Sequence, residues 1–176
     1  MIDLRPLQRE DFALLRSWLA EPLVQRWWAE DPAEVETRYG PAVDGVDPTA
    51  LYVGLEAGRP VGLVQVYRFA DEPAYTAELG AVYPVPDGAL SIDYLLGTAD
   101  VRGRGLGAAL IRAAVERGLA DHPAAHDVLV PVHADNRASW RALERARFVR
   151  VAEGELDPDN PADTRHHVVY RYRRPS

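Results

Sequence analysis

The stretch from Leu90 to Leu110, L-S-I-D-Y-L-L-G-T-A-D-V-R-G-R-G-L-G-A-A-L, constrains the fold of this chain more than any other. Its first part alternates, with Leu90, Ile92, Tyr94 and Leu96 on one side, which predicts a β-strand. Its second part contains several glycines and then becomes a helix rich in alanine and leucine. A strand, a glycine-rich turn and a helix in direct succession predict an α/β domain with a helical crossover.

The turn between this strand and helix suits a phosphate or pyrophosphate. Gly103, Gly105 and Gly107 let a ligand approach the backbone closely, and an ordinary turn needs fewer glycines. The unpaired N–H groups of the helix's first turn form a positively polarised concavity. Arg102 and Arg104 add positive charge beside it.

Two phosphate-binding patterns overlap in this turn. Gly103-x-Gly105-x-x-Ala108 fits the dinucleotide fingerprint, and Asp127 lies about 20 residues further on, where a ribose-binding acid is expected. However, residues 98–102 separate the strand from the first glycine, and too little chain follows to complete a doubly wound sheet. We therefore favour the alternative pattern, R-x-x-G-x-G, over residues 102–107.

The length, cysteine content and net charge of the chain limit the kinds of partner and chemistry that it can have. The 176 residues suffice for one domain, which we expect to span 1–176, and the absence of cysteine excludes disulfides and thiolate chemistry. A net charge of −7 favours a cationic partner over nucleic acid. We find no signal peptide and no apolar run long enough to span a membrane, so we expect a cytoplasmic protein without a membrane partner.

The remaining chain alternates strand and helix patterns. We expect strands at 2–6, 51–57, 60–69, 90–96, 127–133, 148–153 and 165–173, with a hairpin turn at 58–59. Helices are expected at 8–19, 23–28, 31–39, from 106 onward and at 135–147, and residues 70–88 are expected to form a long acidic loop. This order predicts a single mixed, mostly antiparallel sheet flanked by helices.

The glycine-rich turn and the segment 136–148, N-R-A-S-W-R-A-L-E-R-A-R-F, together resemble the GNAT superfamily of N-acetyltransferases. The resemblance covers essentially the whole chain and implies the GNAT fold and acetyl-CoA as cosubstrate, with no metal. It assigns the CoA contacts to Arg102, Gly103, Arg104, Gly105, Leu106, Gly107, Ala108 and Asn136. Leu143 stands where many members place the tyrosine that protonates the departing thiolate, and Arg147 stands at their usual glycine.

Three shorter matches resemble aminoglycoside 6'-N-acetyltransferases. They are V-Q-R-W-W at 24–28, A-E-V-E-T-R-Y-G-P-A-V at 33–43 and S-I-D-Y-L-L at 91–96. This resemblance implies a cationic aminoglycoside amine as acceptor, acetylated directly without an acetyl-enzyme. A siderophore-type lysine acyltransferase branch shares much of the architecture. An acyltransferase of another small amine or of a protein amine, or a non-catalytic acyl-CoA-binding module, therefore remains an alternative.

On the strand, Asp93 lies on the same face as Leu95 and could orient an ammonium group and accept its proton. A merely structural aspartate at a strand end is the alternative for Asp93. The backbone of Leu95 and Leu96 would pair with the pantetheine arm, and an N–H near Leu95 would stabilise the oxyanion.

Aromatic and acidic residues indicate the acceptor side. Trp27 and Trp28 are adjacent and cannot both face one core, so we expect at least one, preferably Trp28, to line a cleft. Tyr39 and Tyr67 are lesser candidates, with core packing as the alternative. Glu78, together with Asp71 and Glu72, could form an acidic rim for a polycation. The five histidines lack metal-ligand spacing, so no metal site is assigned.

Overall fold

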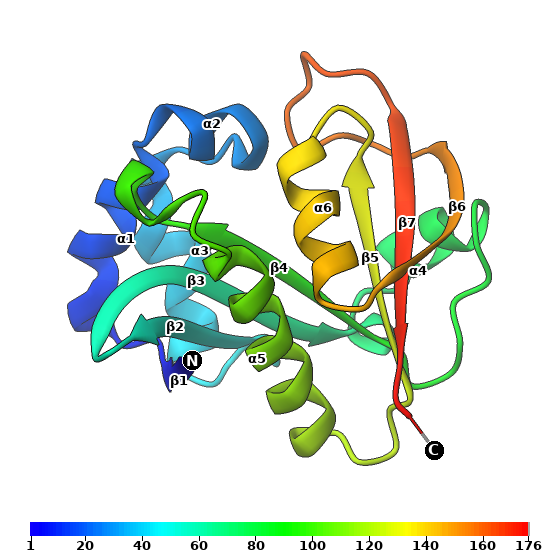
Figure 1. Cartoon of the computed structure of the whole chain (residues 1–176), viewed down its shortest axis with the longest axis horizontal. Coiled ribbons are helices and arrows are strands. Elements are labelled where there is room, and N and C mark those ends of the chain that lie inside the picture. Colours follow the sequence, from blue (N-terminus) through cyan, green and yellow to red (C-terminus); the bar gives the residue numbers. More distant parts are fainter. Residues whose placement is uncertain (176) are drawn as a thin grey trace.

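The computed structural model describes residues 1–175 and contains a seven-stranded sheet in the order β1-β2-β3-β4-β5-β7-β6 (Figure 1). Every neighbouring pair is antiparallel except β4 and β5, which are parallel. The mixed, mostly antiparallel sheet expected from the sequence is therefore confirmed. The strands are β1 Ile2–Pro6, β2 Ala50–Glu56, β3 Arg59–Arg68, β4 Leu90–Leu96, β5 Asp127–His133, β6 Val149–Glu155 and β7 His166–Arg173.

Helices cover both faces of this sheet (Figure 1). They are α1 Phe12–Leu19, α2 Pro22–Trp28, α3 Val35–Val43, α4 Pro73–Gly80, α5 Leu106–Asp121 and α6 Arg137–Arg145, and short 3-10 turns occupy Arg9–Asp11, Pro32–Glu34, Phe69–Asp71 and Ala99–Val101. α5 and α6 pack on one face. On the other face, α1 and α3 cover the β1–β4 half and α4 covers the β5–β7 half. Among residues 1–175, no helix is long and apolar enough to cross a membrane.

β4 separates the apolar layers by the alternation expected from its sequence. Leu90 and Ile92 are buried against α5, whereas Leu95 is buried in the cluster formed with α1 and α3. Each such side chain contributes roughly 1.5–3 kcal/mol of transfer free energy when fully buried. Opposite faces of one strand therefore anchor both helical layers, which holds β4 rigidly at the centre.

β4 and β5 separate soon after they begin. Their only paired residues in the described chain are Leu90 and Val128, and from there the two strands diverge as α5 connects them. At the far end of β4, Gly97 packs against the Trp18 indole so closely that a Cβ would lie 2.2 Å from the indole nitrogen. The end of β4 is thus held against α1 while its β5 side is left open.

The predicted hairpin between β2 and β3 forms, but its turn lies one residue earlier than the expected 58–59, at Ala57 and Gly58, which have φ values of 48° and 77°. Both residues adopt the left-handed conformation that a two-residue hairpin turn requires. The predicted loop at 70–88 is wrong in part, because α4 lies within it. Pro73 begins that helix, and Leu79 is completely buried against Phe69 and its neighbours, so tertiary packing stabilises a helix with little amphipathic pattern.

The ends of two other helices differ from expectation. α3 continues through Gly40 and Pro41 to Val43 instead of ending at Tyr39, since a single proline removes only one helical hydrogen bond. α6 ends at Arg145, and Arg147 adopts φ 71°.

Candidate active site

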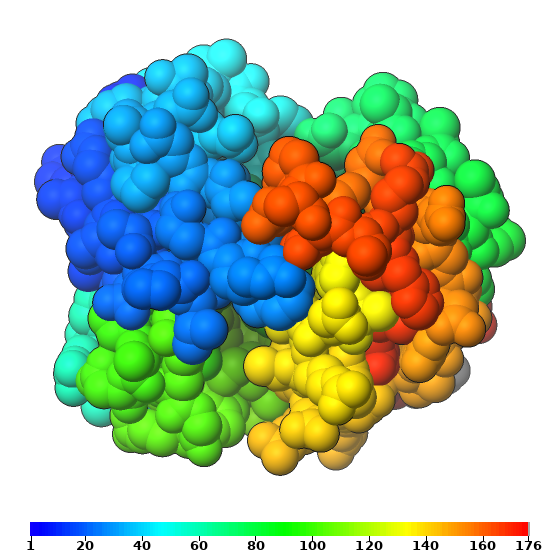
Figure 2. All heavy atoms as spheres, turned by 90° about the horizontal axis from the view of Figure 1, so that it is seen from above, coloured from blue at the N-terminus to red at the C-terminus, as the bar shows by residue number. Residues whose placement is uncertain are grey.

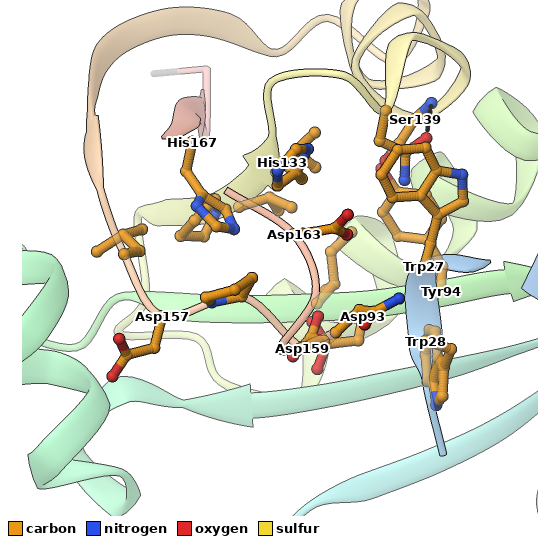
Figure 3. Close-up of a pocket in the computed structure, with 18 of the residues that line it drawn as sticks. Trp27, Trp28, Asp93, Tyr94, His133, Ser139, Asp157, Asp159, Asp163 and His167 are labelled. Carbon is orange, nitrogen blue, oxygen red and sulfur yellow. Dashed lines mark hydrogen bonds between the residues drawn. The ribbon is translucent and has the colours of Figure 1, made fainter. Parts of the chain in front are cut away.

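The separation of β4 from β5 opens a cavity of about 360 Å³ that reaches both faces of the sheet. Asp93, Gln65 and Tyr67 line it on the face shared with α1 and α3, whereas Tyr94 and Ser139 line it on the face shared with α5 and α6. Figure 3 shows side chains from α2, β4, β5, α6 and the segment 156–165 around the cavity. Two reactants could therefore meet here from opposite sides of the sheet.

The Asp93 carboxyl is the central ionisable group of the cavity. Burial away from water raises its pKa to about 7, and the nearby negative charge of Asp159 acts in the same direction. A hydrogen-bonding interaction with the Tyr67 hydroxyl opposes these effects and lowers the pKa. A carboxyl group with this pKa can accept a proton from an amine near neutral pH.

Four further carboxylates line the cavity: Glu30, Asp157, Asp159 and Asp163. They come from the residues after α2 and from the segment 156–165, which joins β6 to β7. Figure 3 shows Asp159 pointing toward Asp93, and desolvation raises the pKa of Asp159 as well. The cavity thus concentrates negative charge, which favours a ligand with several positive charges.

Trp27, Trp28 and Tyr67 all line the cavity, as expected for residues of the acceptor side. Trp28 also packs against the apolar cluster of α1 and α3, whereas Trp27 lies against Arg26 and His133. Tyr39 does not line the cavity and is 3% exposed. The Trp28 indole N–H donates to the Tyr39 hydroxyl at 3.1 Å, and this hydroxyl donates to Glu30 at 2.7 Å. Tyr39 therefore orients two cavity residues from behind.

Asp71, Glu72 and Glu78, which were predicted to form an acidic rim, do not line the cavity. Asp71 forms an ion pair with Arg68 at 2.6 Å, and neither Asp71 nor Glu72 lies on the cavity. Glu78 lies behind it, where the carboxylate accepts the backbone N–H of Asp157 at 2.5 Å. The negative charge comes instead from Glu30 and the 156–165 segment, and the Asp- and Pro-rich composition of that segment was its only sequence signal.

α2 and the 156–165 segment form a roof over the cavity. Arg26 forms an ion pair with Asp163 at 2.6 Å, and the Asn160 amide approaches the Arg26 carbonyl at 3.5 Å. The Arg26 guanidinium also lies over the Trp27 ring, 4.1 Å from its centroid. In Figure 2 the blue surface of α2 meets the orange surface of this segment above the sheet.

His133 anchors the same roof from β5. Its Nδ1 accepts the backbone N–H of Asp135 at 3.2 Å, so its Nε2–H is free to donate to the Thr164 carbonyl at 3.0 Å. The ring also lies 5.7 Å from that of Trp27, centroid to centroid. The hydrogen bonds of His133 therefore link β5 to the 156–165 segment. No group of three or more histidine, aspartate or glutamate side chains suited to a metal occurs in residues 1–175.

The glycine-rich turn has the geometry of an anion site. Gly103 and Gly105 have φ values of 73° and 79°, which side chains rarely adopt, and the space beside both is open. The segment leads into α5, whose first N–H groups have no helical partner. Arg102 lies over the end of β4, where its guanidinium approaches the Leu96 carbonyl at 3.4 Å, and Arg104 pairs with Glu56 at 3.1 Å.

Other predicted CoA contacts take different roles around this turn. The side chains of Leu106 and Ala108 are buried, so only their backbone N–H groups are available to a ligand. Gly107 lies where α5 faces α6, and a Cβ there would be in ordinary contact with the Cβ of Ala142 at 3.5 Å. Asn136 lines the cavity and caps α6, accepting the Ser139 N–H at 3.2 Å through its Oδ1.

In β4, the backbone N–H and C=O groups that are not bonded to β3 belong to every second residue. Gly97 donates to Val61 on β3 at 2.9 Å, so the odd-numbered residues of β4, Leu95 included, direct their N–H and C=O groups toward β3. Tyr94 and Leu96 therefore direct theirs toward the opening. Leu96 therefore has the orientation that the predicted pairing with the pantetheine arm requires, although Arg102 approaches its carbonyl at 3.4 Å. Leu95 lacks this orientation, whereas Tyr94 has it.

Residues 8–156 match the family model described as acetyltransferase (GNAT) domain. The chain belongs to the GNAT acetyltransferase family. It is 29% identical over 168 residues to aminoglycoside N(6')-acetyltransferase type 1 from Klebsiella pneumoniae and to that from Serratia marcescens, covering 92% of this chain and 80% of each relative. The structure of aminoglycoside acetyltransferase AAC(6')-Ib in complex with coenzyme A aligns with a TM-score of 0.77 and 27% identity, covering 99% of this chain and 95% of that one.

A second structure of that enzyme, with coenzyme A and kanamycin, gives a TM-score of 0.75 and 28% identity over the same shares of the two chains.

Leu143 is the residue for which the GNAT resemblance implies a tyrosine in many members. Its side chain is completely buried among α5, α6 and the sheet. That position therefore contributes to the core and offers nothing to the cavity.

Proposed function

We propose that this GNAT protein transfers the acetyl group of acetyl-CoA directly to an amine of an aminoglycoside, the 6'-amine by analogy with its relatives. The cavity carries this proposal, because five carboxylates surround one opening in the sheet: Glu30, Asp93, Asp157, Asp159 and Asp163. Glu30, Asp157 and Asp163 already pair with Arg38, Arg165 and Arg26. Asp93 and Asp159 have no such partner within residues 1–175, so a substrate with a single ammonium group would leave one of these two carboxylates unpaired. An aminoglycoside carries several ammonium groups on a rigid frame of sugar rings.

Asp93 is the proposed general base. It would hold the reacting ammonium by a charge-assisted hydrogen bond and remove its proton, so that the neutral amine attacks the thioester carbonyl. The developing oxyanion would receive hydrogen bonds from the backbone of β4 at its open edge. The remaining carboxylates would hold the other ammonium groups, and Trp27 or Trp28 would cover a sugar ring.

The proposed acetyl-CoA site lies on the face of the sheet that carries α5 and α6, opposite the face of Asp93. Arg102 and the N–H groups at the start of α5 would bind the pyrophosphate, and Asn136 would bond the pantetheine arm through its amide Nδ2–H. In Figure 2 a groove separates the green surface at the start of α5 from the yellow surface of α6, which suits an extended cosubstrate. We propose that residues 1–176 act as one domain in the cytoplasm, where acetyl-CoA is available.

Release of free thiol from acetyl-CoA tests the proposal directly. We expect turnover with kanamycin or tobramycin, with the site of acetylation established by NMR, and no comparable turnover with lysine-like amines, hydroxamate precursors or a protein amine. Asp93→Asn provides the matched inactive variant. Exclusive turnover of a lysine-like or protein amine would replace the proposed acceptor, and CoA binding without any turnover would indicate a non-catalytic module.

The ionic strength dependence separates acceptor classes further. A polycation held by several carboxylates should bind more weakly as salt rises, because exposed charges are screened over about 8 Å at physiological ionic strength. The KM for kanamycin should therefore increase with salt more steeply than the KM for a monoamine. Equal salt dependence for both acceptors would remove the acidic cavity as the basis of recognition.

A further inference from the structure

Leu143 stands where many GNAT members have the tyrosine that protonates the departing thiolate. A leucine side chain has no proton to donate, and this one is buried in the core. We propose that the Tyr94 hydroxyl, held by Ser139, donates the proton to this thiolate. The inference rests on the proposed acetyl transfer and assigns a role within it. Tyr94 would be a catalytic residue and Ser139 a positioning residue.

The geometry of β4 supports this assignment. Asp93 and Tyr94 are adjacent, so their side chains leave the strand on opposite faces of the sheet, and both line the same cavity. Tyr94 packs with the α5 and α6 layer, and the turn suited to phosphate begins α5. The base thus faces the side proposed for the amine, and the hydroxyl faces the side from which the thioester would enter.

The Tyr94 hydroxyl is held in place by a single side chain. It lies 2.7 Å from Ser139 Oγ on the first turn of α6. Both residues are labelled in Figure 3. Because Ser139 can either donate or accept, the tyrosine proton can point to Ser139 at rest and to a sulfur atom when one is present. Burial raises the pKa of Tyr94 above its ordinary value, so the hydroxyl is protonated at rest. The hydrogen bond with Ser139 acts in the opposite direction and lowers this pKa, which favours donation of the proton.

No other cavity residue of the described chain fits this role as well. Tyr67 and Tyr75 lie on the Asp93 side of the sheet. Both ring nitrogens of His133 are engaged, and Nδ1 of His167 bonds the Arg165 carbonyl at 2.8 Å. Tyr170 donates its hydroxyl to Glu144 at 3.0 Å, away from the cavity. Ser139 is an aliphatic hydroxyl and a far weaker acid than a phenol. Tyr94 is the titratable side chain that the α5 and α6 face contributes to the cavity.

Each proton in the proposed step has a donor and an acceptor. Asp93 first removes a proton from the ammonium group and passes it to solvent. The neutral amine nitrogen then forms a bond to the thioester carbon and, now positively charged, loses its second proton to Asp93. The C–S bond of the tetrahedral intermediate then breaks with its electron pair passing to sulfur, which takes the proton of Tyr94 to give the free thiol of CoA. The resulting tyrosinate regains a proton from water, and Asp93 releases its proton to solvent.

Tyr94→Phe removes only the hydroxyl. With kanamycin as acceptor, we expect kcat to fall about 10- to 100-fold, with the KM of both substrates changing by less than about threefold. Ser139→Ala should give a smaller fall in kcat, and Ser139→Thr, which keeps a hydroxyl, should restore it. Tyr52→Phe is the matched control, because Tyr52 lies on the same face and bonds Asp121 at 3.1 Å, outside the cavity.

Binding of CoA and desulfo-CoA, measured by calorimetry, tests the assignment without turnover. The wild-type protein should bind CoA about fivefold more tightly than desulfo-CoA, the size of one net hydrogen bond, and Tyr94→Phe should abolish this preference. A wild-type kcat in folded Tyr94→Phe, or an unchanged preference, would overturn the proposal. If Tyr94→Phe does not fold, the same two measurements on Ser139→Ala and Ser139→Thr decide. Failure of the aminoglycoside assignment alone would leave the CoA preference intact.

Discussion

The Arg26 guanidinium and the Asp163 carboxylate lie 2.6 Å apart and join α2 to the segment between β6 and β7 across the cavity. These residues are 137 positions apart in the sequence, so the ion pair closes the roof only in the folded chain. The contact lowers the pKa of Asp163, chiefly through the hydrogen bond from Arg26. Asp163 therefore stays ionised near the proposed acceptor site.

Arg26→Ala should loosen this roof without unfolding the protein. Exposed ion pairs contribute less than about 1 kcal/mol, so Tm should change little. Amide hydrogen exchange in residues 156–165 should become faster, and the KM for kanamycin should rise a few-fold as the carboxylates lose their arrangement. Arg117→Ala, which removes an ion pair with Asp121 outside the cavity, is the control. Unchanged exchange in residues 156–165 of Arg26→Ala would contradict the prediction.

Asp93→Asn should lower kcat/KM about 100-fold, the loss expected for a missing general base. In the wild-type protein kcat/KM should rise with pH through about 7, since Asp93 must lose its proton before it can accept one from the amine. The variant should lack this rise, apart from the contribution of the amine itself. A folded Asp93→Asn protein with wild-type turnover would assign Asp93 a structural role.

Although Asp93→Asn should lower activity, it should increase the free energy of unfolding at alkaline pH. The pKa of Asp93 is raised from 3.8 to about 7, so the folded protein keeps a proton that the unfolded chain loses. Its contribution to stability is present below about pH 4 and is lost as the pH rises toward 7. Asparagine cannot ionise, so Asp93→Asn should be more stable than wild type at pH 8, by up to about 4 kcal/mol, and by only about 1 kcal/mol at pH 4.5.

Thermal unfolding at both pH values measures this difference. Asp71→Asn is the control of opposite sign, because the hydrogen bond from Arg68 lowers the pKa of Asp71. Asp71 stabilises the fold above its ordinary pKa, so its replacement should lower Tm at pH 8 and have less effect in acid. Equal Tm values for Asp93→Asn and wild type at pH 8 would show that the cavity does not penalise the Asp93 charge.

Local patterns predicted the parts of the fold that they specify directly. The alternation of β4 and the hairpin at Ala57 and Gly58 follow from the period of the strands and the conformation of the turn. α4 was missed because its eight residues have little amphipathic pattern, and the burial of Leu79 against Phe69 stabilises it. That contact depends on the finished sheet and has no local signal.

In the candidate site too, some residues could be predicted from local sequence and others are brought in only by tertiary structure. Asp93 and the turn at 102–107 belong to one continuous stretch, so their motif could be read from the sequence. Glu30 and Asp159 reach the cavity only because α2 crosses the opening and β6 and β7 form the sheet edge. The alternation of β4 predicts only that Tyr94 lies on the apolar face of the strand. Its hydrogen bond depends on Ser139, which is 45 residues further along the chain and lies 2.7 Å from the Tyr94 hydroxyl in the folded protein.

Arg102→Ala should weaken acetyl-CoA at its pyrophosphate. We expect the KM for acetyl-CoA to rise about tenfold, in line with the loss of one charge-assisted hydrogen bond. The KM for acetyl-pantetheine, which has no pyrophosphate, should stay unchanged, and this substrate is the internal control. A rise for both donors would place Arg102 beside the pantetheine arm, where its guanidinium already approaches the Leu96 carbonyl.

Arg147→Gly should stabilise the protein. Arg147 has φ 71°, and the N–H groups of Phe148 and Arg147 bond the carbonyls of Leu143 and Glu144 at 3.0 Å each, which is the pattern of a Schellman helix end. Glycine adopts this conformation without a Cβ penalty, so the free energy of unfolding should rise by about 0.5–1 kcal/mol. Arg147→Ala keeps a Cβ and should show no such gain. Chemical denaturation of both variants measures the difference, and an equal gain for alanine would trace the effect to the loss of the arginine charge instead of the backbone.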